Sequence, residues 1–475
     1  MILFLILTTV SLVYAQFPNW KDKESEVSYL FYDLDAEKVL FSEKNDQLFT
    51  PGSVAKIPTA LFALEQKGAD FRVKTQLGIR GESKEGLLKG DLFLKGEGDP
   101  SLFISHLQNM VLDLKHQNIK KISGSFFYDD SIQISVPEIA HYFRSDQTYN
   151  PGVSALSFQF NRVRILNKGK GKFTFLPELP SFQVNRVSDR FSKGIHVNYV
   201  WNQGKDEWEV SKKQRYSRVT EVPVKHASRF TAEVFRDLAI KAGIEVPLPQ
   251  MGKWDGSVKL VSEVQSAPLL NWVIDAFEYS NNLIAELLLL NSVEKKKIRT
   301  TNDAAAVMEQ WWKNLKVKGS KRVVLKNGSG LHPQTRVSAD FLVDALTRFK
   351  SKKYEGRYFS SLLSSSGWSG WMEKRLREPS FLGRVWAKTG SLDYVSGISG
   401  YLTDQRNHTI AFAILMNDFD KRKFLNEPPL DDLLRKKWIK KAHRLRVRAR
   451  SWKRRAVRYQ DQLLKAVIEG KKKEK

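Results

Sequence analysis

The sequence predicts an α/β protein, more narrowly an α+β protein, in which one mixed unit is interrupted by a long β-rich insert. Three observations indicate this class. Strand-like segments occur near both ends of the 475-residue chain, strongly apolar helical patterns lie between them, and residues 75–256 read as short strands separated by Gly, Pro, Asn and Asp. A single interrupted unit explains this order better than separate domains in a row.

The first segment of the mixed unit is expected at residues 16–74. Val27–Leu34 and Lys38–Ser42 alternate as strands around a short turn. Pro51-Gly52-Ser53 then opens a helical pattern that ends at Gly68. The second segment is expected at 257–430, with helices from Ala267 to Lys350 and strands at Gly383–Lys388, Val395–Leu402 and Thr409–Met416.

The insert, residues 75–256, is expected to contain one or more β-rich domains. Leu88–Leu94, Ile122–Tyr128 and Phe173–Leu176 are typical of its strands, and Ser228–Ala242 predicts a helix near its end.

The N-terminal Met1–Ala15 is apolar and carries no charged side chain, and Val13 and Ala15 fit a small-residue cleavage site. The stretch is shorter than the roughly 20 residues that span a bilayer, so we expect a cleaved signal peptide, with an uncleaved anchor as the alternative. This predicts an exported, periplasmic protein that can also associate with a membrane.

Composition narrows the chemistry. The chain has no Cys, so disulfides, thiolate metal sites and a Cys nucleophile are excluded. The eight His lack ligand spacing, and we expect neither a metal nor another cofactor. The net charge of +26 predicts an anionic partner, but an exported protein is not expected to bind nucleic acid.

The first chemical motif is Ser53-Val54-Ala55-Lys56. Residues three apart share a helix face, so the Lys amine can reach the Ser hydroxyl and activate it as a nucleophile. The pattern alone is weak, because Ser292–Lys295 matches it by chance. The position of Ser53 at a helix start strengthens it, since free backbone N–H groups there can stabilise an oxyanion.

The second motif is Ser280-Asn281-Asn282, between the apolar segments Leu269–Tyr279 and Leu283–Leu290. Polar side chains there either cap a helix or face a cleft. The third is Lys388-Thr389-Gly390-Ser391, at the end of the strand Gly383–Lys388. Its Lys and hydroxyls suit a carboxylate, and its Gly allows a substrate backbone to approach. The alternative is an ordinary Lys on an edge strand.

The three motifs, in this order, resemble those of penicillin-binding proteins and serine β-lactamases. Leu94–Leu102 and Asn327–Leu331, the latter with Asn in place of the family's Asp, resemble further segments of the class C low-molecular-mass penicillin-binding proteins. That family comprises D-alanyl-D-alanine carboxypeptidases and endopeptidases. The resemblance covers roughly residues 27–425 and implies a penicillin-binding fold whose antiparallel sheet is flanked by helices.

The resemblance implies hydrolysis of peptidoglycan peptides and crosslinks through a Ser53 acyl-enzyme, with β-lactams as inhibitors. Lys56 is expected as the base and Ser280 as a proton relay. Asn282 would bind the substrate amide, and Lys388, Thr389, Gly390 and Ser391 its carboxylate. Asp129 is a candidate for binding the diaminopimelate amine, or else an exposed turn carboxylate. A serine β-lactamase and an idle peptidoglycan-binding scaffold are the alternative functions.

Two further features lie outside the motifs. The pairs Trp311-Trp312 and Trp368/Trp371 are expected in the core, with sugar stacking as the alternative. Residues 431–475 carry 18 Lys and Arg against 5 Asp and Glu, and apolar or small residues recur from Trp438 at helical spacing. This predicts a basic amphipathic helix that lies on an anionic membrane, binds a wall polymer, pairs in a coiled coil, or closes the catalytic domain with its first turns and then extends into solvent.

Overall fold

The computed structural model describes residues 18–132, 134–141, 147–169, 172–187, 197–202, 205–211, 219–429 and 431–471. The expected signal peptide, Met1–Ala15, lies outside the described residues.

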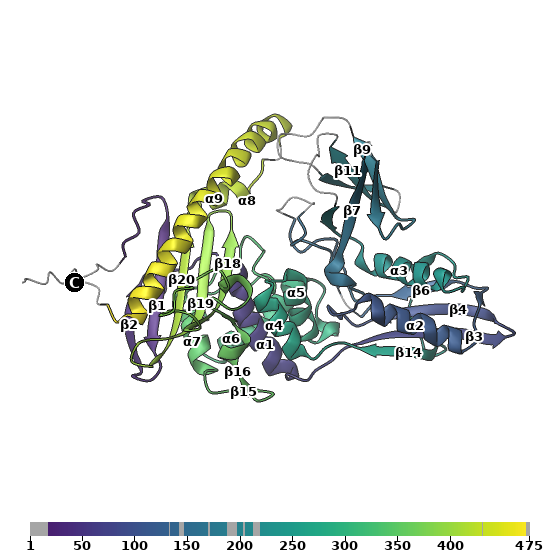
Figure 1. The fold of residues 1–475 in the computed structure, drawn as a ribbon, viewed down its shortest axis with the longest axis horizontal. Coiled ribbons are helices and arrows are strands. Elements are labelled where there is room, and N and C mark those ends of the chain that lie inside the picture. The colour runs from purple at the N-terminus through teal and green to yellow at the C-terminus, as the bar shows by residue number, and fades with distance from the viewer. Residues whose placement is uncertain are drawn as a thin grey trace, which may run out of the picture.

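One antiparallel sheet joins the two ends of the chain. Its strand order is β17-β18-β19-β20-β1-β2, so the N-terminal strands pair directly beside the C-terminal ones (Figure 1). The expected strands and the hairpin between β19 and β20 are confirmed. The bounds are β1 Glu26–Asp33, β2 Lys38–Glu43, β17 Ser364–Ser365, β18 Val385–Leu392, β19 Val395–Thr403 and β20 Thr409–Asn417.

Helices cover one face of this sheet. Alternate side chains of β20 point to opposite faces: Ala411, Ala413 and Leu415 join the core under the helices, whereas Phe412 and Ile414 join a second core on the other face. The helices of the first face are α1 Lys56–Lys67, α4 Leu269–Glu278, α5 Asn282–Asn291, α6 Thr301–Asn314 and α7 Ala339–Arg348. The short hairpin β15 Lys353–Tyr354 and β16 Arg357–Tyr358 follows α7.

The opposite face is covered by α9, Asp432–Ile468, which runs along the sheet after α8, Phe419–Asn426 (Figure 1). The expected helix is confirmed, but its apolar stripe is not available to a membrane or a coiled coil. Trp452 and Leu463 are buried in the second core, and the Trp452 indole N–H donates to Ser25 Oγ at 2.8 Å. The expectation of a solvated extension after closing first turns is also wrong, because the last turns of α9 are its most buried part.

None of the helices in the described ranges combines the length and the apolar character needed to cross a bilayer. α9 is long enough, but Lys and Arg recur throughout it.

The described residues of the insert form three sheets. The largest has the order β13-β6-β4-β3-β14 with β5 beside β4, and it includes β14, beyond residue 256, because β14 pairs with β3. The expected strand Ile122–Tyr128 is two strands, β5 and β6. The bounds are β3 Lys74–Lys84, β4 Leu87–Gly96, β5 Lys121–Ile122, β6 Phe126–Asp129, β13 Pro249–Met251 and β14 Lys259–Gln265.

Helices α2, Ile104–His116, and α3, Ala227–Lys241, pack together on this sheet and share a hydrophobic core with it. The two smaller sheets have the orders β12-β7-β8 and β10-β11-β9. Their bounds are β7 Arg162–Gly169, β8 Lys172–Leu176, β9 Phe182–Val187, β10 Val197–Asn202, β11 Lys205–Ser211 and β12 Val219–Pro223.

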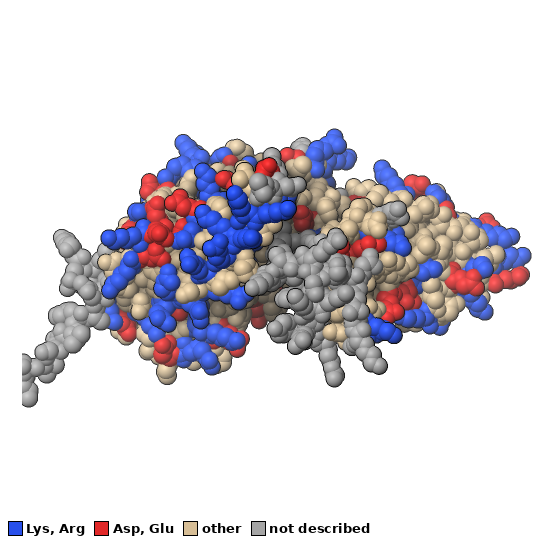
Figure 2. All heavy atoms as spheres, turned by 90° about the horizontal axis from the view of Figure 1, so that it is seen from above, with Lys and Arg blue, Asp and Glu red and all other residues tan. Residues whose placement is uncertain are grey.

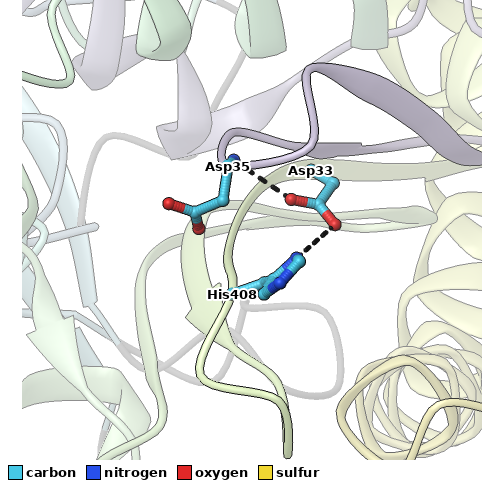
Figure 3. Close-up of side chains that lie close together, drawn as sticks. All are labelled: Asp33, Asp35 and His408. Carbon is cyan, nitrogen blue, oxygen red and sulfur yellow. Dashed lines mark hydrogen bonds and ion pairs between the residues drawn. The ribbon is translucent and has the colours of Figure 1, made fainter.

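The buried carboxylate of Asp33 connects the β1–β2 turn with the β19–β20 turn of this antiparallel sheet. Asp33 accepts backbone hydrogen bonds from Asp35 and Ala36, and its second oxygen lies 2.8 Å from His408 Nδ1 (Figure 3). Arg406 lies 3.4 Å from the same oxygen. Asp33, Asp35 and His408 form the one group in the described ranges with metal-ligand proximity, but these protein contacts account for Asp33 without an ion.

We predict that Asp33→Asn lowers the free energy of unfolding by about 1–3 kcal/mol near neutral pH. Burial raises the pKa of Asp33, but hydrogen bonds from Ala36 and His408 outweigh it and hold that pKa below its ordinary value. The stabilisation is therefore complete above the unfolded-state pKa of about 4 and is lost as the pH falls through the lower folded-state pKa. Urea unfolding at several pH values checks this, with exposed Glu37→Gln as the control; equal stability of wild type and Asp33→Asn would contradict it.

Candidate active site

Ser53 lies on a short 3₁₀ turn, Gly52–Ala55, that leads directly into α1. Gly52 has φ +54°, and a Cβ there would stand only 3.0 Å from the backbone nitrogen of Ser391. Gly52 therefore allows this turn to pack directly against β18. Its positive φ is energetically unfavourable for residues that carry a Cβ. The Ser53 side chain remains half-buried at the edge of this contact.

Lys56 points back from the first turn of α1 toward Ser53. Its Nζ lies 2.9 Å from Ser53 Oγ, as the spacing predicts, and donates to Asn282 Oδ1 at 2.6 Å and to the carbonyl of Ser329 at 3.2 Å. The side chain is only 1% exposed. One amine thus joins the start of α1, the start of α5 and the loop after α6.

Burial is the main cause that lowers the pKa of Lys56 to about 7, and the nearby Glu286 carboxylate acts in the opposite direction. An amine with this pKa is neutral in about half of the molecules at neutral pH, so it can accept the Ser53 proton. The pKa of the second lysine of the site, Lys388, is lowered as well. Burial, and then the charge of Lys56, lower the pKa of Lys388 well below its ordinary value.

Lys388 approaches the same group of side chains from β18. Its Nζ donates to Ser280 Oγ at 3.0 Å and to the Thr389 carbonyl at 2.9 Å, and its side chain is fully buried. The motif lies within β18 rather than at the end of a strand as expected, because β18 continues to Leu392. β17 pairs with β18 only at Trp386 and Ala387, so strand pairing on that side stops just before Lys388.

The segment Ser280-Asn281-Asn282 was expected either to cap a helix or to face a cleft. One of its residues caps a helix, and the other two contact the catalytic lysines. The middle residue caps α5, since Asn281 Oδ1 accepts from the backbone N–H of Ile284 at 3.2 Å. The outer two reach the catalytic lysines: Ser280 contacts Lys388, and Asn282 contacts Lys56. Ser280 has φ +53°, a strained conformation for a serine that places its hydroxyl between the α4–α5 turn and β18.

The Ser53 turn and β18 pack closely, backbone against backbone. A Cβ on Gly390 would stand 3.0 Å from the nitrogen of Ser53 and 2.9 Å from that of Val54. The backbones of Ser53 and Ser391 therefore approach each other at the nucleophile, as an oxyanion hole requires. Thr389 and Ser391 are half-exposed beside it.

Two contributors were not predicted from the sequence. Glu286 is completely buried in α5 and accepts from the backbone N–H groups of Gly328 (3.1 Å) and Ser329 (3.0 Å). It thereby fixes the loop whose Ser329 carbonyl contacts Lys56. The sequence does contain a signal for Glu286, because it is an acidic residue inside the otherwise apolar segment Leu283–Leu290. Tyr149, from the insert, accepts from Asn282 Nδ2 at 2.8 Å through its carbonyl, and no pattern in the sequence indicates this contact.

Asn327, where the family has Asp, stabilises a turn. Its side-chain oxygen accepts from the Gly330 N–H at 3.1 Å, and its amide donates to Ser329 Oγ at 3.2 Å. The replacement of Asp therefore keeps the acceptor that the turn needs.

The structure does not support Asp129 as a contact for a substrate amine. Asp129 is 4% exposed, so it is not the exposed turn carboxylate either. Its oxygens accept from the backbone N–H groups of Ser131 (2.9 Å) and Trp254 (2.8 Å). These contacts assign Asp129 to the architecture of the inserted sheet.

The tryptophan pairs differ. Trp312 is fully buried and Trp311 packs on Phe62, as expected for core residues. Trp368 and Trp371 are 68% and 60% exposed, so the expectation that they lie in the core is wrong. Glycine-rich turns beside β17 hold them at the surface, where helical spacing does not apply.

A serine beside a buried amine, with a second lysine–serine pair and the backbone of β18 close by, is the arrangement of a serine enzyme of the acyl-transfer type. The chain belongs to the D-Ala-D-Ala carboxypeptidase 3 (S13) family, whose model matches residues 13–436. It is therefore a serine peptidase of that family.

Individual relatives agree with this family. The chain is 25% identical over 413 residues to a D-alanyl-D-alanine carboxypeptidase of Actinomadura sp. (strain R39), covering 80% of this chain and 75% of the relative. It is 23% identical over 417 residues to the D-alanyl-D-alanine carboxypeptidase DacB of Haemophilus influenzae, covering 83% and 86%.

The fold is similar to the crystal structure of penicillin binding protein 4 (dacB) from Haemophilus influenzae. The TM-score is 0.71 at 20% identity, over 84% of this chain and 91% of that chain. The same protein complexed with a β-lactam gives a TM-score of 0.70 at 21% identity, with the same coverage. At this identity the likeness concerns the fold.

We predict that the rate of Ser53 acylation by a fluorescent penicillin rises with pH, with a midpoint near pH 7, because only neutral Lys56 accepts the proton. Glu286→Gln should move this midpoint to lower pH, because it removes the charge that raises the pKa of Lys56. Acylation rates measured from pH 5 to pH 10 check both; a flat profile, or an unchanged midpoint in the folded variant, would contradict this account of Lys56.

Proposed function

We propose that this protein is a serine D,D-carboxypeptidase and D,D-endopeptidase of peptidoglycan that works through a Ser53 acyl-enzyme. The observation that carries the proposal is the buried Lys56 amine, held 2.9 Å from Ser53 Oγ and 2.6 Å from Asn282 Oδ1. This arrangement activates a serine without histidine, which suits attack on a peptide carbonyl.

In the first step, Ser53 Oγ bonds to the carbonyl carbon of the penultimate D-Ala while its proton passes to Lys56 Nζ. The carbonyl oxygen becomes an oxyanion next to the backbone N–H groups of Ser53 and Ser391. Asn282 donates one amide hydrogen to Tyr149, and its second amide hydrogen is suited to the substrate carbonyl.

In the second step, the carbon–nitrogen bond breaks and the departing amine takes a proton. We assign the relay of that proton to Ser280, and the contact of its hydroxyl with Lys388 Nζ at 3.0 Å supports this role. The remaining ester on Ser53 is then hydrolysed by water, which releases the shortened peptide and returns the proton to Ser53. A β-lactam, whose amide mimics the D-Ala–D-Ala bond, forms the same ester.

The terminal carboxylate binds at Thr389 and Ser391, whose side chains are accessible, whereas fully buried Lys388 acts from behind them. Burial disfavours the Lys388 cation in the empty site, and an arriving carboxylate favours it. Lys388 therefore helps to position the substrate and Ser280 through its charge. It does not contact the substrate at the protein surface.

The endopeptidase activity follows from the same acyl donor. In a crosslink, the D-Ala carbonyl is bonded to the amine of a diaminopimelate instead of a terminal D-Ala, so Ser53 attacks the same group and only the leaving amine differs. Residues 1–15 support export, which would place the enzyme in the periplasm with this substrate.

We predict that Ser53→Ala abolishes covalent labelling by fluorescent penicillin, because it removes the hydroxyl that lies beside the Lys56 amine at the start of α1. Ser292→Ala is the matched control: Ser292 begins the second S-x-x-K pattern, but its hydroxyl donates to the Leu288 carbonyl. Gel fluorescence measures both variants. Equal labelling of wild type and Ser53→Ala would remove Ser53 as the nucleophile.

We predict that the wild type releases D-Ala from purified pentapeptide muropeptides and cleaves crosslinked dimers, whereas Ser53→Ala does neither. Mass spectrometry measures the two products separately. Release of D-Ala while the crosslinked dimers stay intact would contradict the proposed endopeptidase activity. Rapid nitrocefin turnover without either product would identify a β-lactamase. A folded wild type that neither labels nor cleaves would identify an idle scaffold.

A further inference from the structure

The outer face of α9 is a continuous basic surface. From residue 433 to residue 460 the helix contains no Asp or Glu, and at about 1.5 Å per residue this stretch is about 42 Å long. Twelve of its cationic side chains are exposed: Arg435, Lys436, Lys437, Lys440, Lys441, Arg444, Arg448, Arg450, Lys453, Arg454, Arg455 and Arg458. Figure 2 shows Lys and Arg side chains crowded over the N-terminal half of this helix.

Internal contacts do not explain this charge. Within the described part of the chain, one of the twelve forms an ion pair, Arg455 with Asp22 at 2.9 Å. The family model ends at residue 436, so all but the first five residues of α9 lie beyond the part of the chain matched to the peptidase family. The basic helix face is therefore an addition to the catalytic unit.

The apolar side of α9 constrains how this surface can be used. Ala442, Ala449, Trp452, Ala456 and Leu463 are buried against the catalytic sheet. The helix cannot turn this side to a partner without uncovering that core, so binding must use the outer face, without insertion of the apolar stripe. Such binding is dominated by charge and is sensitive to salt.

Apolar side chains among the cations indicate the kind of anionic partner. Leu434, Ile439 and Val447 are 53%, 39% and 55% exposed. At a bilayer surface, such side chains enter the headgroup region while neighbouring Lys and Arg meet lipid phosphates. A purely charged polysaccharide offers them no comparable environment.

The position of α9 is compatible with catalysis at a surface. α9 and the helices that carry Ser53, Lys56 and Asn282 cover opposite faces of the same sheet (Figure 1). We propose that the outer face of α9 docks the enzyme on a membrane rich in anionic phospholipid, with Ser53 and Lys56 on the far side of the sheet. This proposal is independent of the peptidase activity.

The test is co-sedimentation of the full chain with vesicles of phosphatidylcholine, alone or mixed with phosphatidylglycerol. Neutral vesicles measure any binding by the apolar residues 1–15, so the difference between the two vesicles reports α9. The test variant changes Lys440, Arg444, Arg454 and Arg458 to Gln. The control changes four exposed lysines of the insert to Gln and loses the same charge: Lys84, Lys89, Lys115 and Lys120.

We expect strong binding to anionic vesicles at about 0.05 M salt and loss of this binding at about 0.5 M salt. The α9 variant should partition at least about tenfold more weakly than the control, with an unchanged melting temperature. Equal binding of the α9 variant and the control would overturn the proposal, as would equal binding to both vesicles. Binding to dextran sulfate but not to anionic vesicles would overturn the membrane as the partner.

Discussion

The burial of the Lys56 amine is the constraint on which the active site depends. A charged amine in this position would be costly, and burial lowers its pKa to about 7. Its three contacts, with Ser53, Asn282 and the Ser329 carbonyl, come from three segments that are far apart in the chain. The same contacts that orient the amine therefore also hold the catalytic unit together around it.

Close backbone approach makes this burial possible. Gly330 has φ +76°, and a Cβ there would overlap the carbonyl oxygen of Gly52, so the loop after α6 can only reach the Ser53 turn with glycine at this position. Gly390 plays the same part on β18, where a Cβ would overlap the carbonyl of Pro51. Glu286 then fixes the loop after α6 through two backbone hydrogen bonds. The backbones of β18 and of the loop after α6 thus both pack against the Ser53 turn.

Much of the fold and site could be predicted because the signals are local. Ser53 and Lys56 are three residues apart, so their contact follows from helix geometry, and β19 and β20 follow from strand alternation around a tight turn. The contact of Glu286 with Gly328 and that of Tyr149 with Asn282 depend on how distant segments pack, which spacing does not encode.

Asp129 and α9 illustrate the same limit. In the sequence, a polar residue at the end of a strand looks the same whether it faces a substrate or bonds to the backbone. Asp129 does the latter, since it accepts from the backbone N–H of Trp254. The stripe on α9 predicts which side of the helix is apolar but not that the catalytic sheet covers it. Trp368 and Trp371 were placed wrongly because helical spacing was assumed where the chain forms turns.

The most direct measurement of the central claim is an NMR titration of the Lys56 amine. Protein labelled with ¹³C at the lysine ε-carbon, with the Lys56 signal assigned by its loss in Lys56→Arg, reports the protonation of this one group. The account predicts a titration midpoint near pH 7. A Lys56 signal that titrates at the ordinary lysine pKa of about 10.4 would contradict it, because the amine would then be a cation at neutral pH and unable to accept the Ser53 proton.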